Sequence, residues 1–177
     1  MTAFIQGFID EFQRYRLLAE KAIAQSTDGA LNHVPVGDGN SIAMIVRHVN
    51  GNLTSRFTDF LTSDGEKPTR DRDGEFADGF WSRDEITTAW SQGFEVVERA
   101  LAPLTDADLQ RTVAIRNVQL TVHEALCRSI AHTAMHAGQI ILLAKIEAGE
   151  QWSTLSIPKG QSAQYNMNPT REKRPVA

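Results

Sequence analysis

The segment from Thr121 to Gly149 constrains the fold of this chain more than any other. Its apolar residues recur on every side of a helical projection: Leu126, Ile130, Ala134, Ala137, Ile140, Ile141, Leu142 and Ala144. A helix that is apolar all round must be covered by other elements. The segment opens with Thr121-Val122-His123-Glu124, a capping-box pattern in which Thr and Glu bond the free amides of a helix start. The sequence therefore predicts a long, buried helix over these residues.

Three further segments have helical periodicity. Apolar residues spaced by three and four predict an amphipathic helix over residues 3–25. A second helix is expected from Ser41 to about Leu61, with Asp38 or Asn40 as its N-cap. A third is expected from about Arg83 to Ala102, after another capping box.

The connections between these helices differ in length and composition. Residues 28–40 are rich in glycine and proline and predict a loop. A long, charged loop follows from residue 63 to beyond residue 73, and loops of this length are often functional. Residues 105–109 predict a short helical turn, and residues 112–120 a short strand or hairpin before the last helix.

Four long helices with little strand indicate an all-α protein, a four-helix bundle. The length of 177 residues fits one domain, which we place at residues 1–168, with a disordered polar tail over residues 169–177. Because the last helix needs cover on every side, we expect a homodimer that buries a helix pair against its mate.

Charge and cysteine content exclude several classes of protein. Eighteen basic and 22 acidic side chains give a net charge of −4, which argues against a nucleic-acid binder. We see no signal peptide and no apolar stretch of membrane-spanning length, so we expect no membrane association. The single cysteine, Cys127, allows no intrachain disulfide and fits a cytoplasmic location. We expect it to be a small buried hydrophobe.

Histidines provide the candidate metal ligands. His132 and His136 stand one turn apart on the last helix, with Gln139 on the same stripe. An HxxxH pair alone is weak evidence, because core or surface histidines give the same pattern. His48 lies at the edge of the apolar face of the second helix, where a structural role competes with a ligating one. Periodicity therefore leaves a metal site as one alternative.

Two sequence stretches sharpen this alternative, NSIAMIVRH (residues 40–48) and IAHTAMHAGQI (residues 130–140). They resemble the two metal-binding helices of the DinB/YfiT-like superfamily. The stretches NLTSRFTDFLTSDGEKP (52–68) and SIPKGQS (156–162) resemble an uncharacterised branch of it, a domain of unknown function. The resemblance implies an up-down-down-up four-helix bundle, commonly a homodimer. It also implies one divalent metal ion bound by His48, His132 and His136, with nickel or zinc favoured over iron or manganese.

Some members of that superfamily are metal-dependent transferases that use low-molecular-weight thiols, and others are described as hydrolases. Three imidazoles and an open fourth position are typical of catalytic metal sites. A metal held in this way can activate water or bind a thiol as thiolate. We therefore predict a metal-dependent enzyme, a thiol transferase or hydrolase acting on a small molecule. The alternative is a non-catalytic, metal-stabilised dimeric binding module.

Several polar residues have two interpretations. Gln139 either orients a histidine or ligand, or bonds a neighbouring helix. Asn52, Arg56 and Asp59 either form a cleft wall in which Arg56 recognises an anion such as a carboxylate, or belong to a surface where Arg56 pairs with Asp59. We favour the surface pair. The charged side chains nearby either cap a cleft or are solvated, namely Asp64, Glu66, Lys67 and Lys159.

Overall fold

Four long helices form the body of the protein. The computed structural model describes residues 3–35, 37–170, 172–173 and 175. The long helices are α1 (Ala3–Ala24), α3 (Ile42–Phe57), α4 (Arg83–Leu101) and α5 (Val122–Ala148). The shorter elements are α2 (Asp28–Asn32), α6 (Ser162–Asn166), the 3-10 turns η1 (Gly74–Phe76), η2 (Asp106–Gln110) and η3 (Gly149–Gln151), and the strands β1 (Thr112–Ile115) and β2 (Val118–Thr121). The described chain is thus mostly helical, with one small antiparallel hairpin.

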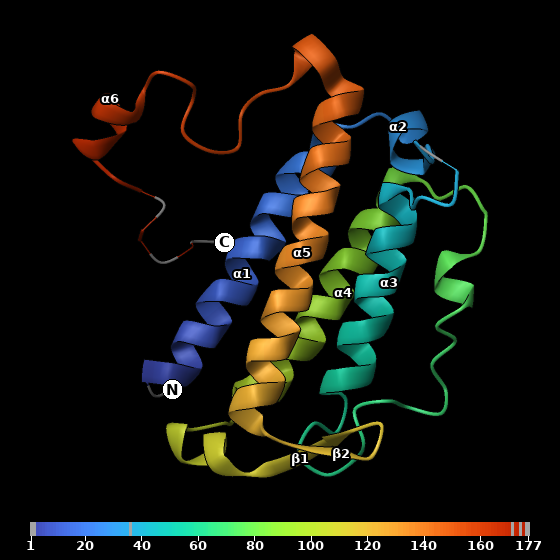
Figure 1. Cartoon of the computed structure of the whole chain (residues 1–177), viewed down its shortest axis with the longest axis vertical. Helices are drawn as coiled ribbons and strands as arrows, with labels where there is room; N and C mark the ends of the chain where they lie inside the picture. The colour runs from blue at the N-terminus through green and yellow to red at the C-terminus, as the bar shows by residue number, and fades with distance from the viewer. Residues whose placement is uncertain (1–2, 36, 171, 174, 176–177) are drawn as a thin grey trace.

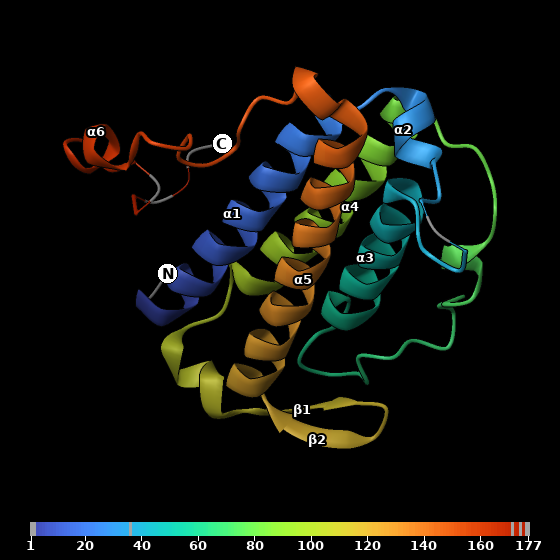
Figure 2. The same ribbon diagram turned by 45° about the horizontal axis from the view of Figure 1, so that its top comes forward.

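The four long helices pack side by side (Figure 1). Helix α1 contacts α5 and α4, and α3 contacts α4 and α5. Helices α1 and α5 run in one direction, and α3 and α4 run in the other (Figures 1 and 2). Because α3 and α4 are parallel, the segment of residues 58–82 must return along the bundle before α4 begins. This segment and the β1–β2 hairpin lie next to α3 and to the start of α5 (Figure 2), and both contribute side chains to one pocket.

The core lies between the four long helices. Trp90 and Phe94 on α4 are its largest fully buried side chains. The indole nitrogen of Trp90 donates to the carbonyl of Arg16 at 3.2 Å, so its one polar atom is satisfied. Burying an aromatic or branched aliphatic side chain contributes about 1.5–3 kcal/mol, so this core stabilises the packing of the bundle.

Both predicted capping boxes are present. Thr121 and Glu124 cap α5, and Ser82 and Glu85 cap α4. The ends of α1, α4 and α5, the turn η2 and the hairpin lie where the sequence predicts them, within a few residues. The predicted loop over residues 28–40 instead begins with the short helix α2, which Thr27 caps.

Helix α3 differs from its prediction at both ends. Its N-cap is Ser41, whose hydroxyl accepts from the amide of Met44, and not Asp38 or Asn40. It ends at Phe57 rather than at Leu61. Asp59 has a φ of 49°, which a right-handed helix cannot contain. Asp59 is therefore in an exposed turn and not on the polar stripe of α3.

The single chain leaves part of α5 uncovered. Met135, Leu142 and Ile146 on α5 are 54%, 58% and 61% exposed. Cys127 is also exposed, in contrast to the prediction of a buried cysteine. Helices α1 and α3 pack against α5 and leave these side chains uncovered.

The C-terminal segment follows η3. Tyr165 of α6 donates its hydroxyl to Glu172 at 2.8 Å and accepts from the amide of Thr170 at 3.1 Å. Of the predicted disordered tail, residues 171, 174 and 176–177 lie outside the described residues. None of the described helices combines the length and apolar character that crossing a membrane requires.

Candidate metal centre

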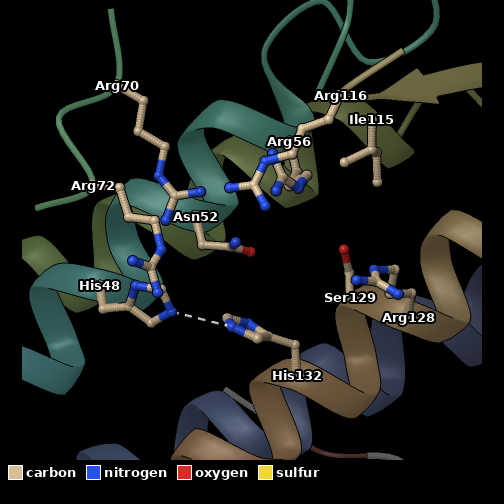
Figure 3. A pocket seen from close by; sticks show the side chains of 10 residues that line it. All are labelled: His48, Asn52, Arg56, Arg70, Arg72, Ile115, Arg116, Arg128, Ser129 and His132. Carbon is tan, nitrogen blue, oxygen red and sulfur yellow. Dashed lines mark hydrogen bonds between the residues drawn. The ribbon is translucent and has the colours of Figure 1, made fainter. Parts of the chain in front are cut away.

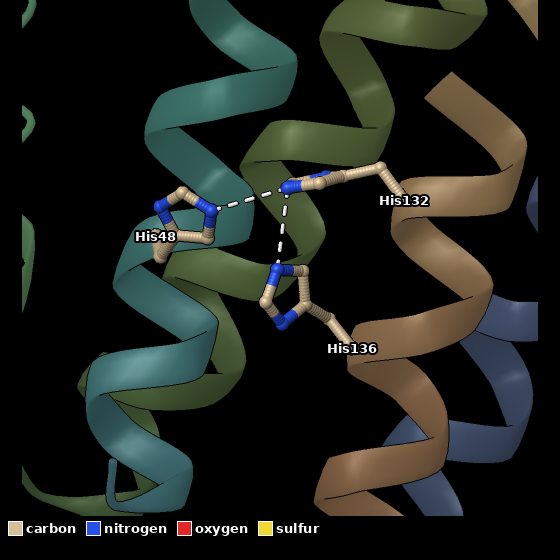
Figure 4. A group of neighbouring side chains, drawn as sticks. All are labelled: His48, His132 and His136. Atoms are coloured by element: carbon tan, nitrogen blue, oxygen red, sulfur yellow. Dashed lines mark hydrogen bonds between the residues drawn. The ribbon is translucent and has the colours of Figure 1, made fainter. Parts of the chain in front are cut away.

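Three histidines from two helices converge between α3 and α5 (Figure 4). Nε2 of His132 lies 3.2 Å from Nε2 of His48 and 3.2 Å from Nε2 of His136. One ligand atom from each ring lies within 4.8 Å of the others. His48 and His136 are buried, and His132 is partly buried. The structure therefore brings together all three predicted ligands.

The outer nitrogens of two of these rings have fixed partners. Nδ1 of His48 lies 2.9 Å from Oε2 of Glu75, and Nδ1 of His136 lies 2.7 Å from Oε1 of Gln139. Each oxygen is an acceptor, so each Nδ1 is the protonated nitrogen that donates. In the neutral ring the proton then sits on Nδ1 and the lone pair on Nε2. Both Nε2 lone pairs point toward His132.

Burial keeps the α5 histidines neutral. Desolvation lowers the pKa of His132 to about 4, and the neighbouring rings of His136 and His48 add to this effect. Desolvation also lowers the pKa of His136, although its hydrogen bond to Gln139 opposes the shift. The neutral imidazole is the form that binds a metal.

The donor set fits a divalent cation. Nε2 of His132 carries at most one proton and cannot make a linear hydrogen bond to both neighbouring nitrogens at once. Nδ1 of His132 is buried without a hydrogen-bond partner among the described residues. The cluster therefore has more nitrogen lone pairs than N–H groups to donate to them. Imidazole nitrogens of this kind are preferred ligands of borderline-soft cations such as zinc or nickel.

Glu75 contacts the histidine cluster, and nothing in the sequence singles it out. It lies in η1, its side chain is 9% exposed, and its two oxygens accept from Nε and Nη2 of Arg70 at 2.7 and 2.8 Å. Arg70 is itself only 4% exposed. Burial alone would raise the pKa of Glu75, but the hydrogen bonds from His48 and Arg70 outweigh it, and the pKa lies below its ordinary value. Glu75 is thus an ionised acceptor that orients His48.

The backbone around Glu75 is tied to α3. Arg47 donates to the carbonyls of Gly74 and Ala77, on either side of Glu75. The Phe76 ring lies 4.8 Å from the His48 ring, centroid to centroid. No periodicity in the loop distinguishes Glu75 from the other acidic residues near it, so only the folded contacts identify it.

Gly51, in the middle of α3, gives Glu75 its space. A Cβ at this position would lie 2.8 Å from Cδ of Glu75 and would overlap Oε1. The carboxylate cannot move away easily, because Arg70 and His48 hold it. A glycine in a helix normally costs about 1 kcal/mol relative to alanine, and here close approach requires it.

We therefore expect Gly51→Ala to lower the free energy of unfolding by about 1–3 kcal/mol, the usual cost of overpacking. The matched control is Gly7→Ala in α1, where an added Cβ has no neighbour within 4 Å. This control should raise the free energy of unfolding by up to about 1 kcal/mol. Urea denaturation of both metal-free variants measures the difference. Stabilisation by both substitutions would contradict the close packing of Glu75 on Gly51.

The remaining predicted residues divide between the site and the surface. Gln139 orients His136, as one of its two interpretations predicts. Asn52 is buried beside His48. Arg56 does not pair with Asp59; it donates to the carbonyl of Gly65 and to Glu66, the latter at 2.9 Å. The expected surface pair is therefore wrong, because Asp59 has left the helix.

The charged loop residues bind the chain itself. Asp64 accepts from the amides of Arg116 and Asn117 in the hairpin turn, at 2.8 and 2.7 Å. Lys67 donates to the carbonyls of Ser55 and Asp64 at 3.0 and 2.6 Å. Lys159 is exposed in the C-terminal segment and does not line the pocket over the histidines. The loop is thus fastened to α3 and to the hairpin.

A pocket opens directly onto the histidines (Figure 3). His48 and His132 form part of its wall, beside Asn52 and Ser129. Its other lining residues are Arg56, Arg70, Arg72, Ile115, Arg116 and Arg128. A small molecule in this pocket would reach two of the three rings.

Comparison with known proteins identifies one family. The sequence model of a family described as "Protein of unknown function (DUF1572)" matches residues 1–161. No curated protein and no solved structure matches the chain.

Proposed function

We propose that this chain, which belongs to the DUF1572 family of unknown function, is a metal-dependent enzyme. It acts on a small molecule at the three-histidine cluster. The observation that carries this proposal is the convergence of three Nε2 atoms beside an open pocket, whose wall includes His48 and His132. Structural metal sites are usually closed by four protein ligands. Among the described residues, three side chains meet here and a pocket adjoins them.

The residues of the chain have distinct parts in this proposal. His48, His132 and His136 would hold the ion. Glu75 and Gln139 would fix the orientation of two of these rings, and such partners typically change metal affinity 10–100-fold. When bound, a divalent ion on three imidazoles can activate water or a thiol as a nucleophile.

The finer assignments are also proposals. The stretches over residues 40–48 and 130–140 support membership of the DinB/YfiT-like superfamily, with its four-helix topology. Thiol transfer and hydrolysis are the two reaction types that this resemblance supports. Nickel and zinc are the metals we favour, since imidazole suits both.

Cobalt(II) substitution tests the enzyme proposal independently of activity. We expect the visible spectrum of the cobalt-loaded protein to change on addition of a low-molecular-weight thiol or azide, because a position remains open to exogenous ligands. Thiol-transfer and ester-hydrolysis assays with the same protein then separate the two reaction types. A spectrum that no added ligand changes would instead support the non-catalytic binding module, whose folding should depend strongly on the metal.

The exposed apolar side chains of α5 support the homodimer. Met135, Leu142 and Ile146 on α5 are spaced by seven and four residues and share one face of the helix, and Phe4 on the neighbouring α1 is 69% exposed. Exposed apolar faces commonly mark interfaces. We propose that a second copy of the chain covers this surface.

We expect Leu142→Glu to convert a dimer into a monomer at micromolar concentration in analytical ultracentrifugation, because the substitution places a charge in the buried interface. The control is Val118→Glu, which replaces a 61% exposed residue on the hairpin and should leave the dimer intact. A wild-type protein that sediments as a monomer would remove the dimer from the proposal.

A further inference from the structure

Five arginines gather around the pocket over the histidines, from four separate segments (Figure 3). They come from α3, the loop after it, the hairpin turn and α5, and they are Arg56, Arg70, Arg72, Arg116 and Arg128. The chain as a whole carries a net charge of −4. The pocket therefore concentrates positive charge on a protein that is acidic overall.

The carboxylates of the chain neutralise only part of this charge. Among these five arginines, Glu75 pairs only with Arg70. Glu66 contacts three guanidinium groups, at 2.9 Å from Arg56, 3.7 Å from Arg70 and 3.2 Å from Arg116. One carboxylate shared by three arginines leaves an excess of positive charge in the pocket.

Two of the arginines have little or no pairing. The side chain of Arg128 makes no ion pair or hydrogen bond with any residue that the structure describes, and it is exposed. Arg72 lies over the Phe76 ring at 5.3 Å, and its nearest carboxylate is that of Asp73, at 3.9 Å and fully exposed. Arg116 is 60% exposed despite its contact with Glu66. These guanidinium groups are available to a ligand.

Two buried polar side chains face the same space. Asn52 is 9% exposed and Ser129 is 7% exposed. Neither side chain has a hydrogen-bond partner among the described residues, and both point into the pocket (Figure 3). The polar atoms of both side chains are open to the pocket, where a polar ligand or water can bond them.

We propose that this pocket binds a small molecule through an oxyanion group, a carboxylate or phosphate, held by Arg72, Arg116 and Arg128, with Asn52 and Ser129 contacting its polar atoms. The planar guanidinium fork matches two oxygens of such a group, and these charge-assisted bonds are among the strongest hydrogen bonds. His48 and His132 in the same wall place the bound molecule beside the metal centre. The assignment of this molecule as the substrate rests on the proposed function, whereas its binding in the pocket is independent of that function.

The test is calorimetric titration of the metal-free full-length protein with two probes, inorganic phosphate and malonate, at low salt, where charge pairs are least screened. We expect saturable one-to-one binding of at least one probe. Phosphate alone, or malonate alone, would identify which oxyanion the pocket prefers. No saturable binding of either probe would overturn the proposal.

The pocket variant is Arg72→Gln/Arg128→Gln, and its control is Arg99→Gln/Lys145→Gln, which removes the same charge from exposed positions elsewhere. We expect the pocket variant to bind at least about tenfold more weakly, since it loses charge-assisted hydrogen bonds, and the control to bind within about twofold of wild type. Equal weakening in both would show a general charge effect and refute the site. All four replaced residues are exposed, and matching thermal melts would verify that both variants fold.

Metal content separates this proposal from the preceding one. The pocket variant should retain the metal of the wild-type protein, because neither arginine contacts a histidine nitrogen. Oxyanion binding by a protein that takes up no metal would overturn the proposed metal-dependent enzyme and support the oxyanion pocket. Metal uptake without oxyanion binding would overturn the oxyanion pocket and leave the metal site in place.

Discussion

His132→Ala protein, purified without an affinity tag, should contain almost no divalent metal, whereas the wild-type protein should contain about one equivalent per chain. His132 occupies the centre of the cluster, because its Nε2 is the atom that lies 3.2 Å from both of the others. Its loss leaves His48 and His136 on different helices without the nitrogen between them. Elemental analysis of the purified proteins measures the difference.

The matched control is His123→Ala. His123 lies on the same helix but is exposed, with Cys127 Sγ 3.7 Å from its Nε2 and the Phe8 ring beside it. Its replacement should leave the metal content unchanged. Equal metal in wild type and His132→Ala would place the ion elsewhere. No metal in the wild type, even after incubation with nickel, zinc and manganese, would favour a metal-free binding module.

The ligands on α5 could be predicted because helix geometry fixes them locally. Residues three and four apart on a helix lie on one face, so the spacing of His132, His136 and Gln139 determines their relative positions without any tertiary information. The same applies to Thr121 and Glu124, whose capping box sets the start of the helix. The role of His48 could be assigned only from the fold, because its position at the edge of an apolar face allowed both a structural and a ligating role.

Glu75 could not be predicted, because its role depends on a contact across 27 positions of sequence between an irregular loop and α3. The arginine pocket is similar, as it assembles side chains from four segments whose relative placement only the fold determines. Asp59 was misplaced for a different reason. The apolar residues Phe60 and Leu61 continue the helical pattern beyond Phe57, while the backbone has already turned.

The exposed side of α5 marks the limit of reasoning from periodicity. A helix with apolar residues all round predicts complete burial, and the single chain covers only part of it. The apolar pattern of α5 therefore reflects its burial in an assembly, which we propose to be a dimer of this chain.

Glu75→Gln should have the second largest effect and should change both metal affinity and stability. Glutamine keeps the size of the side chain but removes the charge and one of the two strong acceptors. His48 loses a fixed orientation, and metal affinity should fall about 10–100-fold. Arg70, whose side chain is only 4% exposed, loses its closer ionic partner, and the free energy of unfolding should fall by about 2 kcal/mol. Competition with a chromophoric chelator and urea denaturation of the metal-free protein measure the two quantities.

Glu66→Gln is the control that separates orientation of His48 from general loosening of the loop. Glu66 lies in the same segment and also contacts Arg70, at 3.7 Å, but it bonds no histidine. At 24% exposure its pairs are partly screened by solvent, so its loss should destabilise the protein by less than about 1 kcal/mol and leave metal affinity unchanged. If both variants lose metal affinity equally, Glu75 acts only by holding the loop. If Glu75→Gln alone loses affinity, the hydrogen bond between Glu75 and Nδ1 of His48 is the means by which a loop residue controls the metal centre.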